Sequence, residues 1–225
     1  MGENQEPIFV IPPEKGPNRL ARLFLRLTHS GIERALGLRE IDRIYRSACS
    51  LNPSRTFADR VLASAGVAYT YSENDLAGVP KTGPVMVVAN HPFGGIEGVV
   101  LLSLLKRVRP DVRVMANYLL RVIPEMREDF IFVDPFGSSG SAKANLKPIK
   151  ECMAWLKQGG LLVVFPAGEV SSYDRRANRV RDKVWSASIA AIIRKTEATA
   201  VPLFFAGRNS TAFNAAGVLH ARFRT

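Results

Sequence analysis

One histidine stands directly after an apolar run and shortly before a carboxylate. His91 follows Val85–Ala89 and Asn90, and Glu97 lies six positions further along the chain. A histidine at such a place can act as general base on a hydroxyl, and a carboxylate that reaches its far ring nitrogen would fix the tautomer and stabilise the imidazolium. The Pro-Phe-Gly-Gly turn at 92–95 permits a sharp bend. The alternative is a histidine that only caps a helix or bonds to a backbone carbonyl.

Three further turns repeat this arrangement of an apolar run followed by small and polar residues. The run Leu161–Phe165 is followed by Pro166, Gly168 and Glu169; Ala200–Phe204 by Gly207, Arg208, Asn209 and Ser210; and Phe130–Val133 by Asp134, Pro135 and a Gly/Ser tract. Ligands of open α/β sheets bind outside the carboxyl ends of the strands. We therefore expect these turns to contribute to one site with His91.

Together the four turns resemble the lysophospholipid (glycerolipid) acyltransferase superfamily over about residues 80–212. The stretch NHPFGGIEG at 90–98 and the Gly-Arg-Asn-Ser turn at 207–210 are most similar to its bacterial hemolysin-like branch. The resemblance implies that His91 deprotonates an acceptor hydroxyl, which then attacks the thioester carbonyl of an acyl carrier, with Glu97 as its partner. It also implies substrate-binding roles for the following residues: Asn90, Pro92, Gly94, Gly95, Phe165, Pro166, Gly168, Glu169, Arg208 and Asn209.

The motifs depart from the superfamily pattern in ways that bear on the acceptor. The superfamily commonly has four residues between His and Asp, whereas five separate His91 from Glu97. Pro135 and Val170 stand near the places where the superfamily carries arginines, the first of which is associated with acceptor phosphate. Glu169 is two positions past the usual acidic position, and it either supplies that carboxylate or caps a helix. The missing arginines favour a lysolipid without a bare phosphomonoester, such as a lyso-ornithine lipid.

No cofactor or metal is expected beyond the co-substrate, a thioester of acyl carrier protein or coenzyme A. The two cysteines, Cys49 and Cys152, fit neither a disulfide framework nor a zinc motif. The chain has no G-x-S-x-G nucleophile elbow. Direct transfer without an acyl-enzyme is consistent with both observations.

Charge is the outlying property of the composition. Lys plus Arg number 31 against 20 Asp plus Glu, which gives a net charge of +11 and a pI near 10.1. Such a balance favours anionic partners: a phosphate-bearing substrate, an anionic bilayer or nucleic acid. No zinc finger, helix-turn-helix or aromatic-interleaved basic motif is present, so no nucleic-acid partner is expected. The basic run at 175–183 is either an anion contact or a solvated face.

Beyond Pro80, apolar runs alternate with helical patterns, which predicts an α/β domain with a mostly parallel sheet flanked by helices. We place this domain at residues 67–225, opening with a short strand at 67–71. The other expected strands are Val85–Ala89, Val112–Ala116, Phe130–Val133, Leu161–Phe165 and Ala200–Phe204. Helices are expected at about 96–107, 142–158, 183–195 and 211–219.

Residues 1–66 are predicted to form an N-terminal arm and an amphipathic helical segment. Between Arg19 and Arg46, seven arginines flank a Leu/Phe stripe. This pattern suits a helix in the interface of an anionic membrane, and the alternative is packing on the α/β domain. Asn52-Pro53 predicts an N-cap and first helical residue. Because no apolar run approaches ~20 residues and the start does not resemble a secretory signal, we expect a peripheral protein on the cytoplasmic face of the inner membrane.

The leading hypothesis is an O-acyltransferase that moves a fatty acyl group from acyl carrier protein or acyl-coenzyme A to a lysolipid hydroxyl. A nearby alternative is hydrolysis of the same thioester by water. Two alternatives of other classes are a catalytically inactive lipid-binding relative, suggested by the altered motifs, and a basic nucleic-acid-binding protein, suggested by charge alone.

Overall fold

The computed structural model describes residues 38–134 and 141–210, with side chains from residue 144 onward in the second range. The chain divides into two compact units, of which the first ends at Ala68 and the second begins at Tyr69. The second unit contains every predicted catalytic and substrate-binding residue. Of the predicted amphipathic stretch from Arg19 to Arg46, residues 19–37 lie outside the described residues.

The first unit contains two packed helices, α2 (Leu38–Ser50) and α3 (Phe57–Ser64). The rings of Tyr45 and Phe57 meet edge to face with centroids 6.0 Å apart. Tyr45 and Ala48 of α2 and Leu62 of α3 are buried, so both helices bury apolar side chains.

The predicted helix start at Asn52-Pro53 is wrong, because a better cap lies four residues later. Thr56 Oγ1 accepts a hydrogen bond from the Asp59 N–H (3.1 Å) and donates one to Asp59 Oδ2 (2.7 Å). These contacts satisfy the first turn of α3. Asn52 instead closes a turn, in which its side chain accepts from the Ser54 N–H.

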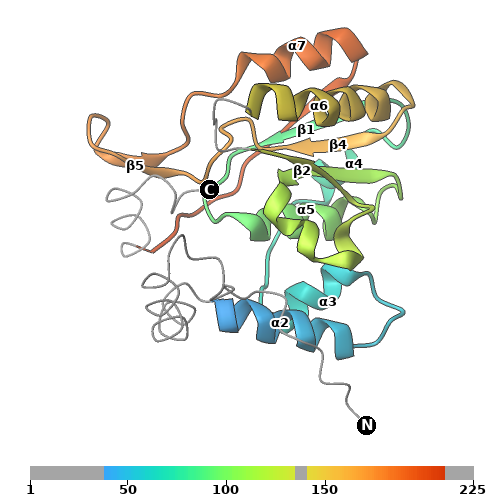
Figure 1. The fold of residues 1–225 in the computed structure, drawn as a ribbon, viewed down its shortest axis with the longest axis vertical. Coiled ribbons are helices and arrows are strands. Elements are labelled where there is room, and N and C mark those ends of the chain that lie inside the picture. Colours follow the sequence, from blue (N-terminus) through green and yellow to red (C-terminus); the bar gives the residue numbers. More distant parts are fainter. Residues whose placement is uncertain (1–37, 135–140, 211–225) are drawn as a thin grey trace, which may run out of the picture. The chain divides into compact units, whose positions relative to one another are not determined.

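The second unit is built on a parallel sheet of five strands in the order β3-β2-β4-β1-β7 (Figure 1). The strands are β1 (Val85–Ala89), β2 (Val112–Asn117), β3 (Phe130–Val133), β4 (Leu161–Val164) and β7 (Thr199–Leu203). The predicted α/β class is therefore confirmed. Within the described sheet β7 is an edge strand that pairs with β1 alone. Pro202 lacks a backbone N–H, and an edge strand tolerates it because no second neighbouring strand needs that donor.

Helices cover both faces of this sheet. Figure 1 shows α5 (Gly95–Leu105) on one face and both α6 (Ser141–Lys157) and α7 (Ala187–Thr196) on the other. The core under α6 and α7 is an apolar cluster of Met86, Ile131, Cys152, Leu156, Leu162, Val164, Ile189, Ile192 and Ala198. Every residue of α5 from Glu97 to Leu105 is buried, which agrees with its nearly continuous apolar sequence.

Smaller elements depart from the sequence-based expectations. The predicted strand at 67–71 is wrong, since no strand forms there, and a short helix α4 (Glu73–Ala77) follows instead. The segments η2 (Tyr118–Val122) and η3 (Pro124–Met126) are 3-10 turns after β2. Helix α7 begins at Ala187 rather than 183, because the Ser186 side chain caps it. The predicted helix at 211–219 lies outside the described residues.

A short antiparallel hairpin that the sequence did not predict projects from the sheet after β4. Its strands are β5 (Ser172–Asp174) and β6 (Arg179–Arg181), joined by a four-residue turn (Figure 1). The hairpin carries the basic run noted above. It lies between β4 and α7 in the chain, and so within the segment that leaves the carboxyl edge of the sheet.

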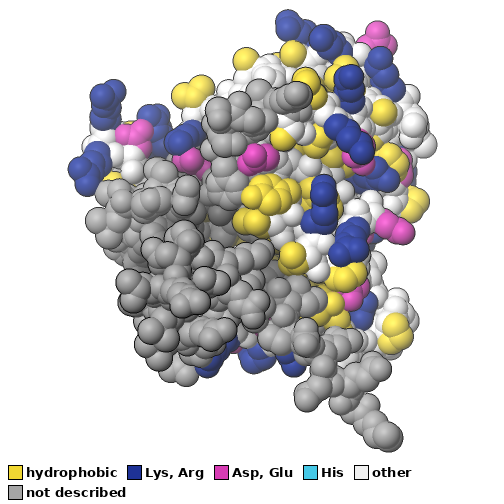
Figure 2. Space-filling view, in the orientation of Figure 1, with side chains coloured by type: hydrophobic (Ala, Val, Ile, Leu, Met, Phe, Trp, Pro, Cys, Tyr) yellow, Lys and Arg dark blue, Asp and Glu magenta, His cyan; other side chains and the backbone are white. Residues whose placement is uncertain are grey.

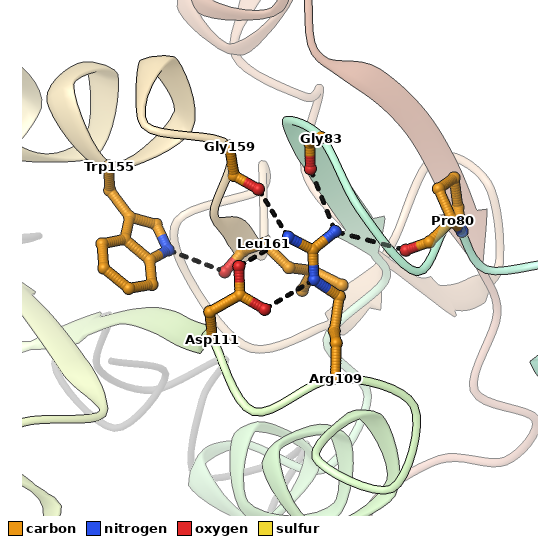
Figure 3. A network of polar contacts seen from close by, with 7 residues as sticks. All are labelled: Pro80, Gly83, Arg109, Asp111, Trp155, Gly159 and Leu161. Atoms are coloured by element: carbon orange, nitrogen blue, oxygen red, sulfur yellow. Dashed lines mark hydrogen bonds and ion pairs between the residues drawn. The ribbon is translucent and has the colours of Figure 1, made fainter.

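A saturated arginine network closes the opposite, amino edge of the sheet (Figure 3). Arg109, whose side chain is 3% exposed, donates to both carboxylate oxygens of Asp111 at 2.7 and 2.6 Å. Its remaining N–H groups reach the carbonyls of Pro80, Gly83 and Gly159. These partners precede β1, β2 and β4, so one side chain joins the starts of three strands.

No helix in the described part of the chain is both long and apolar enough to span a bilayer.

Candidate active site

The strand order brings the motif-bearing turns to one edge of the sheet. Strand β1 lies between β4 and β7, and all three run parallel. The turns that begin at Asn90, Phe165 and Phe204 therefore leave the sheet at its carboxyl edge next to one another. This is where an open α/β sheet binds its ligand.

His91 and Glu97 face each other at this edge. His91 Nδ1 lies 3.5 Å from Glu97 Oε2, and the Glu97 side chain is 1% exposed while that of His91 is 16% exposed. Within the described residues neither of these two buried atoms makes a hydrogen bond of normal geometry. The contact directs the carboxylate to one ring nitrogen and leaves Nε2 as the nitrogen available to a substrate.

The position of Glu97 follows from how α5 begins. Gly94 adopts φ +97°, a conformation that favours glycine, and the chain enters the helix directly after it. Glu97 then lies in the first turn, where its Oε1 accepts a hydrogen bond from the Phe93 N–H (2.5 Å). Positive charge at the helix N-terminus also favours a carboxylate here. The extra residue between His91 and Glu97 is thus accommodated in the turn.

Phe165 fixes the plane of the His91 ring. The two rings stack with centroids 4.2 Å apart and planes 25° apart. Phe165 directly follows β4, so the stack joins the predicted third motif to the first. Pro166 is buried beside it, and its carbonyl accepts from the Ser186 N–H.

Asp182, the residue directly after β6, accepts a hydrogen bond from the backbone of His91. Its Oδ1 accepts from the His91 N–H (3.2 Å) and from the Ser171 hydroxyl, and its Oδ2 accepts from Trp185 Nε1 (2.9 Å). The Ser171 N–H in turn donates to the His91 carbonyl (2.8 Å). Both backbone polar groups of His91 are therefore bonded to the segment that follows β4.

A cavity of about 420 Å³ opens beside this arrangement. Its walls come from the turn around His91, from the hairpin and from the segment after β7: Asn90, Pro92, Ser171, Arg179, Val180, Arg181, Asp182, Trp185, Phe204 and Gly207. The two chain neighbours of His91 are among these residues. The volume lies within the usual range of about 300–1,000 Å³ for small-molecule sites.

Some of the predicted substrate-binding residues line the cavity, and others determine the path of the backbone. Asn90 and Pro92 line the cavity, but the Asn90 amide also bonds to both backbone groups of Phe205, at 2.9 and 2.7 Å. This pair of hydrogen bonds extends the β1–β7 pairing by one step. Gly94 and Gly168 lie in turns, Gly168 with φ +71°, and Gly95 is the first residue of α5.

An ion-pair partner of Glu169 in the structure is Lys183. Glu169 Oε2 accepts a 2.8 Å ion-paired hydrogen bond from Lys183 Nζ. It does not cap a helix, since the residues after it lead into β5. Arg208 is exposed and Asn209 half-buried in the segment after β7. Pro135 of the second motif lies outside the described residues.

Sequence reasoning missed Asp182 and Ser171, and it named Gly207 only as part of the turn after Ala200–Phe204. Gly207 adopts φ +119°, and a Cβ there would lie 2.6 Å from Phe93 Cζ, so the last motif packs tightly against the first. Asp182 is 91 residues from His91 in the chain. The sequence feature that could have drawn attention to Asp182 was its place between two cations of the basic run, Arg181 and Lys183.

The described residues contain no group of three or more His, Cys, Asp and Glu side chains arranged to hold a metal ion. The chemistry that the described site offers is a general base beside a cavity. A histidine oriented by a carboxylate suits proton removal from a hydroxyl or from water.

Comparisons with known proteins relate this sequence to acyltransferases. The sequence profile of the family described as acyltransferase matches residues 11–223. A lyso-glycine lipid O-acyltransferase of Phocaeicola vulgatus is 31% identical over 139 residues, which cover 61% of this chain and 47% of that protein. A second lyso-glycine lipid O-acyltransferase, of Bacteroides thetaiotaomicron, is 32% identical over 146 residues, which cover 64% of this chain and 51% of that protein.

The chain spans about half the length of the curated relatives it matches. The predicted membership of an acyltransferase superfamily is confirmed, whereas the hemolysin-like branch stays a prediction. Because the family profile covers nearly the whole sequence and the matched region contains the His91 site, this chain belongs to the acyltransferase family.

Proposed function

We propose that this protein is a lysolipid O-acyltransferase in which His91 is the general base. The observation that carries the proposal is the His91 Nδ1–Glu97 Oε2 contact of 3.5 Å at the edge of a cavity. The names of the two relatives support a lysolipid acceptor, and of the known acceptor classes we favour one with an amino-acid headgroup.

The reaction needs one proton acceptor and no covalent enzyme intermediate. His91 Nε2 takes the proton of the lysolipid hydroxyl while the oxygen attacks the thioester carbonyl of the donor. The buried Glu97 carboxylate stabilises the imidazolium that forms. The tetrahedral intermediate then expels the thiolate, which takes the proton from the imidazolium. The products are the O-acylated lipid and the free thiol of the carrier.

The donor is proposed to be a thioester of acyl carrier protein or coenzyme A, both of which are anionic. The net charge of +11 supports either donor through electrostatic attraction. We further propose that the protein acts at an anionic membrane surface as a peripheral protein on the cytoplasmic face. The basic side chains of the projecting hairpin, visible at the left of Figure 2, support this placement.

The test is acyl transfer from labelled acyl carrier protein and acyl-coenzyme A to a panel of lyso-glycine, lyso-ornithine and lysophosphatidate acceptors. Wild type should form labelled lipid, and His91→Ala should lower the rate by ~10²-fold or more, as expected for loss of a general base. The matched control is Lys195→Gln, an exposed position in the last turn of α7.

Three results would contradict the proposal. If wild type acylates no acceptor but binds lipid, the chain is a binding relative rather than an enzyme. If it releases free fatty acid from the donor at the same rate with and without acceptor, it is a thioester hydrolase. Equal rates for wild type and His91→Ala would remove His91 from the mechanism.

A further inference from the structure

We propose that Arg179 forms a binding site for a carboxylate or phosphate group of a substrate that is seated in the cavity beside His91. The inference rests on the proposed function, since it concerns how a substrate of the His91 site is held. It assigns a specific role to one member of the basic run at 175–183, for which the sequence left a solvated face as the alternative.

The cations of this run differ in whether an acidic side chain is paired with them. Arg181 donates to Asp174 Oδ2 through Nε (2.8 Å) and lies 2.5 Å from it through Nη2. Lys183 is paired with Glu169. Arg179 pairs with Asp174 through the backbone of the hairpin, but its guanidinium has neither an ion pair nor a hydrogen bond with any residue that the structure describes, so it is free to bind an added anion.

The partner of Arg181 is itself a well-held carboxylate. Asp174 Oδ1 accepts from the N–H groups of Arg176 (2.8 Å) and Ala177 (3.1 Å) in the hairpin turn. These bonds, with that from Arg181, keep the pKa of Asp174 below its ordinary value. Because Asp174 stays ionised, the charge of Arg181 is already balanced, and Arg179 supplies the uncompensated charge of the hairpin strand.

Only two of these cations face the cavity. Arg179 and Arg181 line it, whereas Arg175, Arg176 and Lys183 do not. Its lining also contains Asn90 and Pro92, the chain neighbours of His91. An anionic group bound to Arg179 would therefore lie in the same cavity that these neighbours of the base line.

The remaining lining fits the apolar part of an amphipathic substrate. Trp185 is 43% and Phe204 is 78% exposed, and both border the cavity. A molecule with an apolar chain and an acidic end would place the chain along these rings and the acid on the guanidinium. A lysolipid with an acidic headgroup has both parts, and so does a donor whose fatty acyl chain follows a phosphate-bearing carrier.

The experiment compares Arg179→Gln with Arg175→Gln, which removes an exposed charge from the same hairpin without touching the cavity. Each is assayed with a hydroxylated N-acylglycine that has a free carboxylate and with its methyl ester. The donor arm compares acyl-coenzyme A with an acyl-N-acetylcysteamine thioester, which has no phosphate. Both KM and kcat are measured for each substrate.

We expect Arg179→Gln to raise the KM for the free acid by about tenfold or more, with little change for the ester. Arg175→Gln should change the KM by less than about twofold. If instead KM rises only for acyl-coenzyme A and not for the phosphate-free donor, the anion site stands and its ligand is the donor phosphate. If neither KM changes, or if both variants raise KM equally, the proposal is overturned.

A binding measurement separates this inference from the proposed function. Quenching of Trp fluorescence by the same N-acylglycine, in the His91→Ala background, needs no turnover, and Trp185 lies in the cavity wall. Saturable quenching that weakens about tenfold with Arg179→Gln would support the site even if no acceptor were acylated. Equal quenching with and without Arg179 would overturn it even if acyl transfer were established.

Discussion

The two edges of the central sheet use charged side chains in opposite ways. At the amino edge, Arg109 makes hydrogen bonds with all five of its N–H groups, to one carboxylate and three carbonyls. At the carboxyl edge, Nδ1 of His91 and Oε2 of Glu97 are buried and face each other at 3.5 Å without a normal hydrogen bond. A saturated network stabilises the fold, whereas a buried pair that is incompletely bonded is typical of a functional site.

The difference also appears in what each network joins. Arg109 binds backbone carbonyls before β1 and β4, and its loss would loosen the starts of the strands. Asp182 binds the backbone of a single functional residue, His91. We therefore expect variants at the amino edge to change stability and variants at the carboxyl edge to change turnover.

The largest expected effect is on stability at the amino edge. Arg109→Ala leaves three carbonyls and the Asp111 carboxylate without their donor, and should lower the free energy of unfolding by about 3 kcal/mol. Urea denaturation followed by circular dichroism measures this change. Arg107→Ala is the matched control, because Arg107 is exposed and the hydrogen bonds of its side chain to described residues are those at 3.4 Å to Tyr69 and Tyr71.

The Arg109→Ala protein that remains folded should have a kcat within about threefold of that of wild type. A large loss of kcat in fully folded protein, without a loss of stability, would break the proposed division between the two edges. So would equal destabilisation by Arg107→Ala.

The next effect concerns Asp182 as a positioning residue. Asp182→Ala removes the acceptor of the His91 N–H, the Ser171 hydroxyl and the Trp185 indole, and should lower kcat by about 10- to 100-fold. The decisive readout is kcat, because Asp182 also lines the cavity and holds Trp185, so that its loss changes the cavity wall and KM as well. Steady-state kinetics at saturating acceptor separates kcat from KM.

Asp129→Asn is the control for Asp182, since its ion pair with Lys106 lies at the amino edge. It should leave kcat within about twofold. If Asp182→Ala instead lowers only the thermal midpoint and leaves kcat unchanged in folded protein, Asp182 is a structural residue and not a positioning one.

The smallest effect is a pH dependence at the amino edge. Hydrogen bonds from Arg109 hold the pKa of Asp111 below its ordinary value. Such a group contributes stability above the unfolded-state pKa, near 4, and loses it as the pH falls through the lower folded-state pKa. Because Asp111 is partly exposed, solvent screening keeps this contribution below ~1 kcal/mol.

Urea midpoints measured at several values from pH 7 to pH 2 test this dependence. Between pH 7 and pH 5 the urea midpoint of wild type should be higher than that of Asp111→Asn by a constant amount. Below about pH 4 the two midpoints should converge. A difference that grows on acidification would have the wrong sign for the Arg109–Asp111 pair.

The sequence predicted the sheet well because burial imposes a strong pattern. The runs at Val85–Ala89, Phe130–Val133 and Leu161–Val164 are strands that the core requires to be apolar. The strand predicted at 67–71 failed because an apolar and aromatic pattern forms a strand only where a partner strand is available. Helix starts at Thr56 and Ser186 were missed because single side chains decide them.

The site was only partly predictable for a different reason. His91 and Glu97 share one turn, so their spacing in the sequence carried the signal. Asp182, Arg179 and Gly207 reach the same place only through the order of β1, β4 and β7 and through a hairpin of two three-residue strands. Strands that short, with charged residues in them, have no periodicity to detect.

The account rests on Glu97, and not Glu169, being the carboxylate that serves His91. The most direct test is kcat/KM for acyl transfer by Glu97→Gln and Glu169→Gln, with thermal unfolding as a check of folding. Gln at 97 keeps an oxygen for the Phe93 N–H but removes the charge beside His91 Nδ1. The account predicts a loss of about 10²-fold for Glu97→Gln and of no more than about threefold for Glu169→Gln. Wild-type kcat/KM in folded Glu97→Gln, or a larger loss in Glu169→Gln, would contradict it.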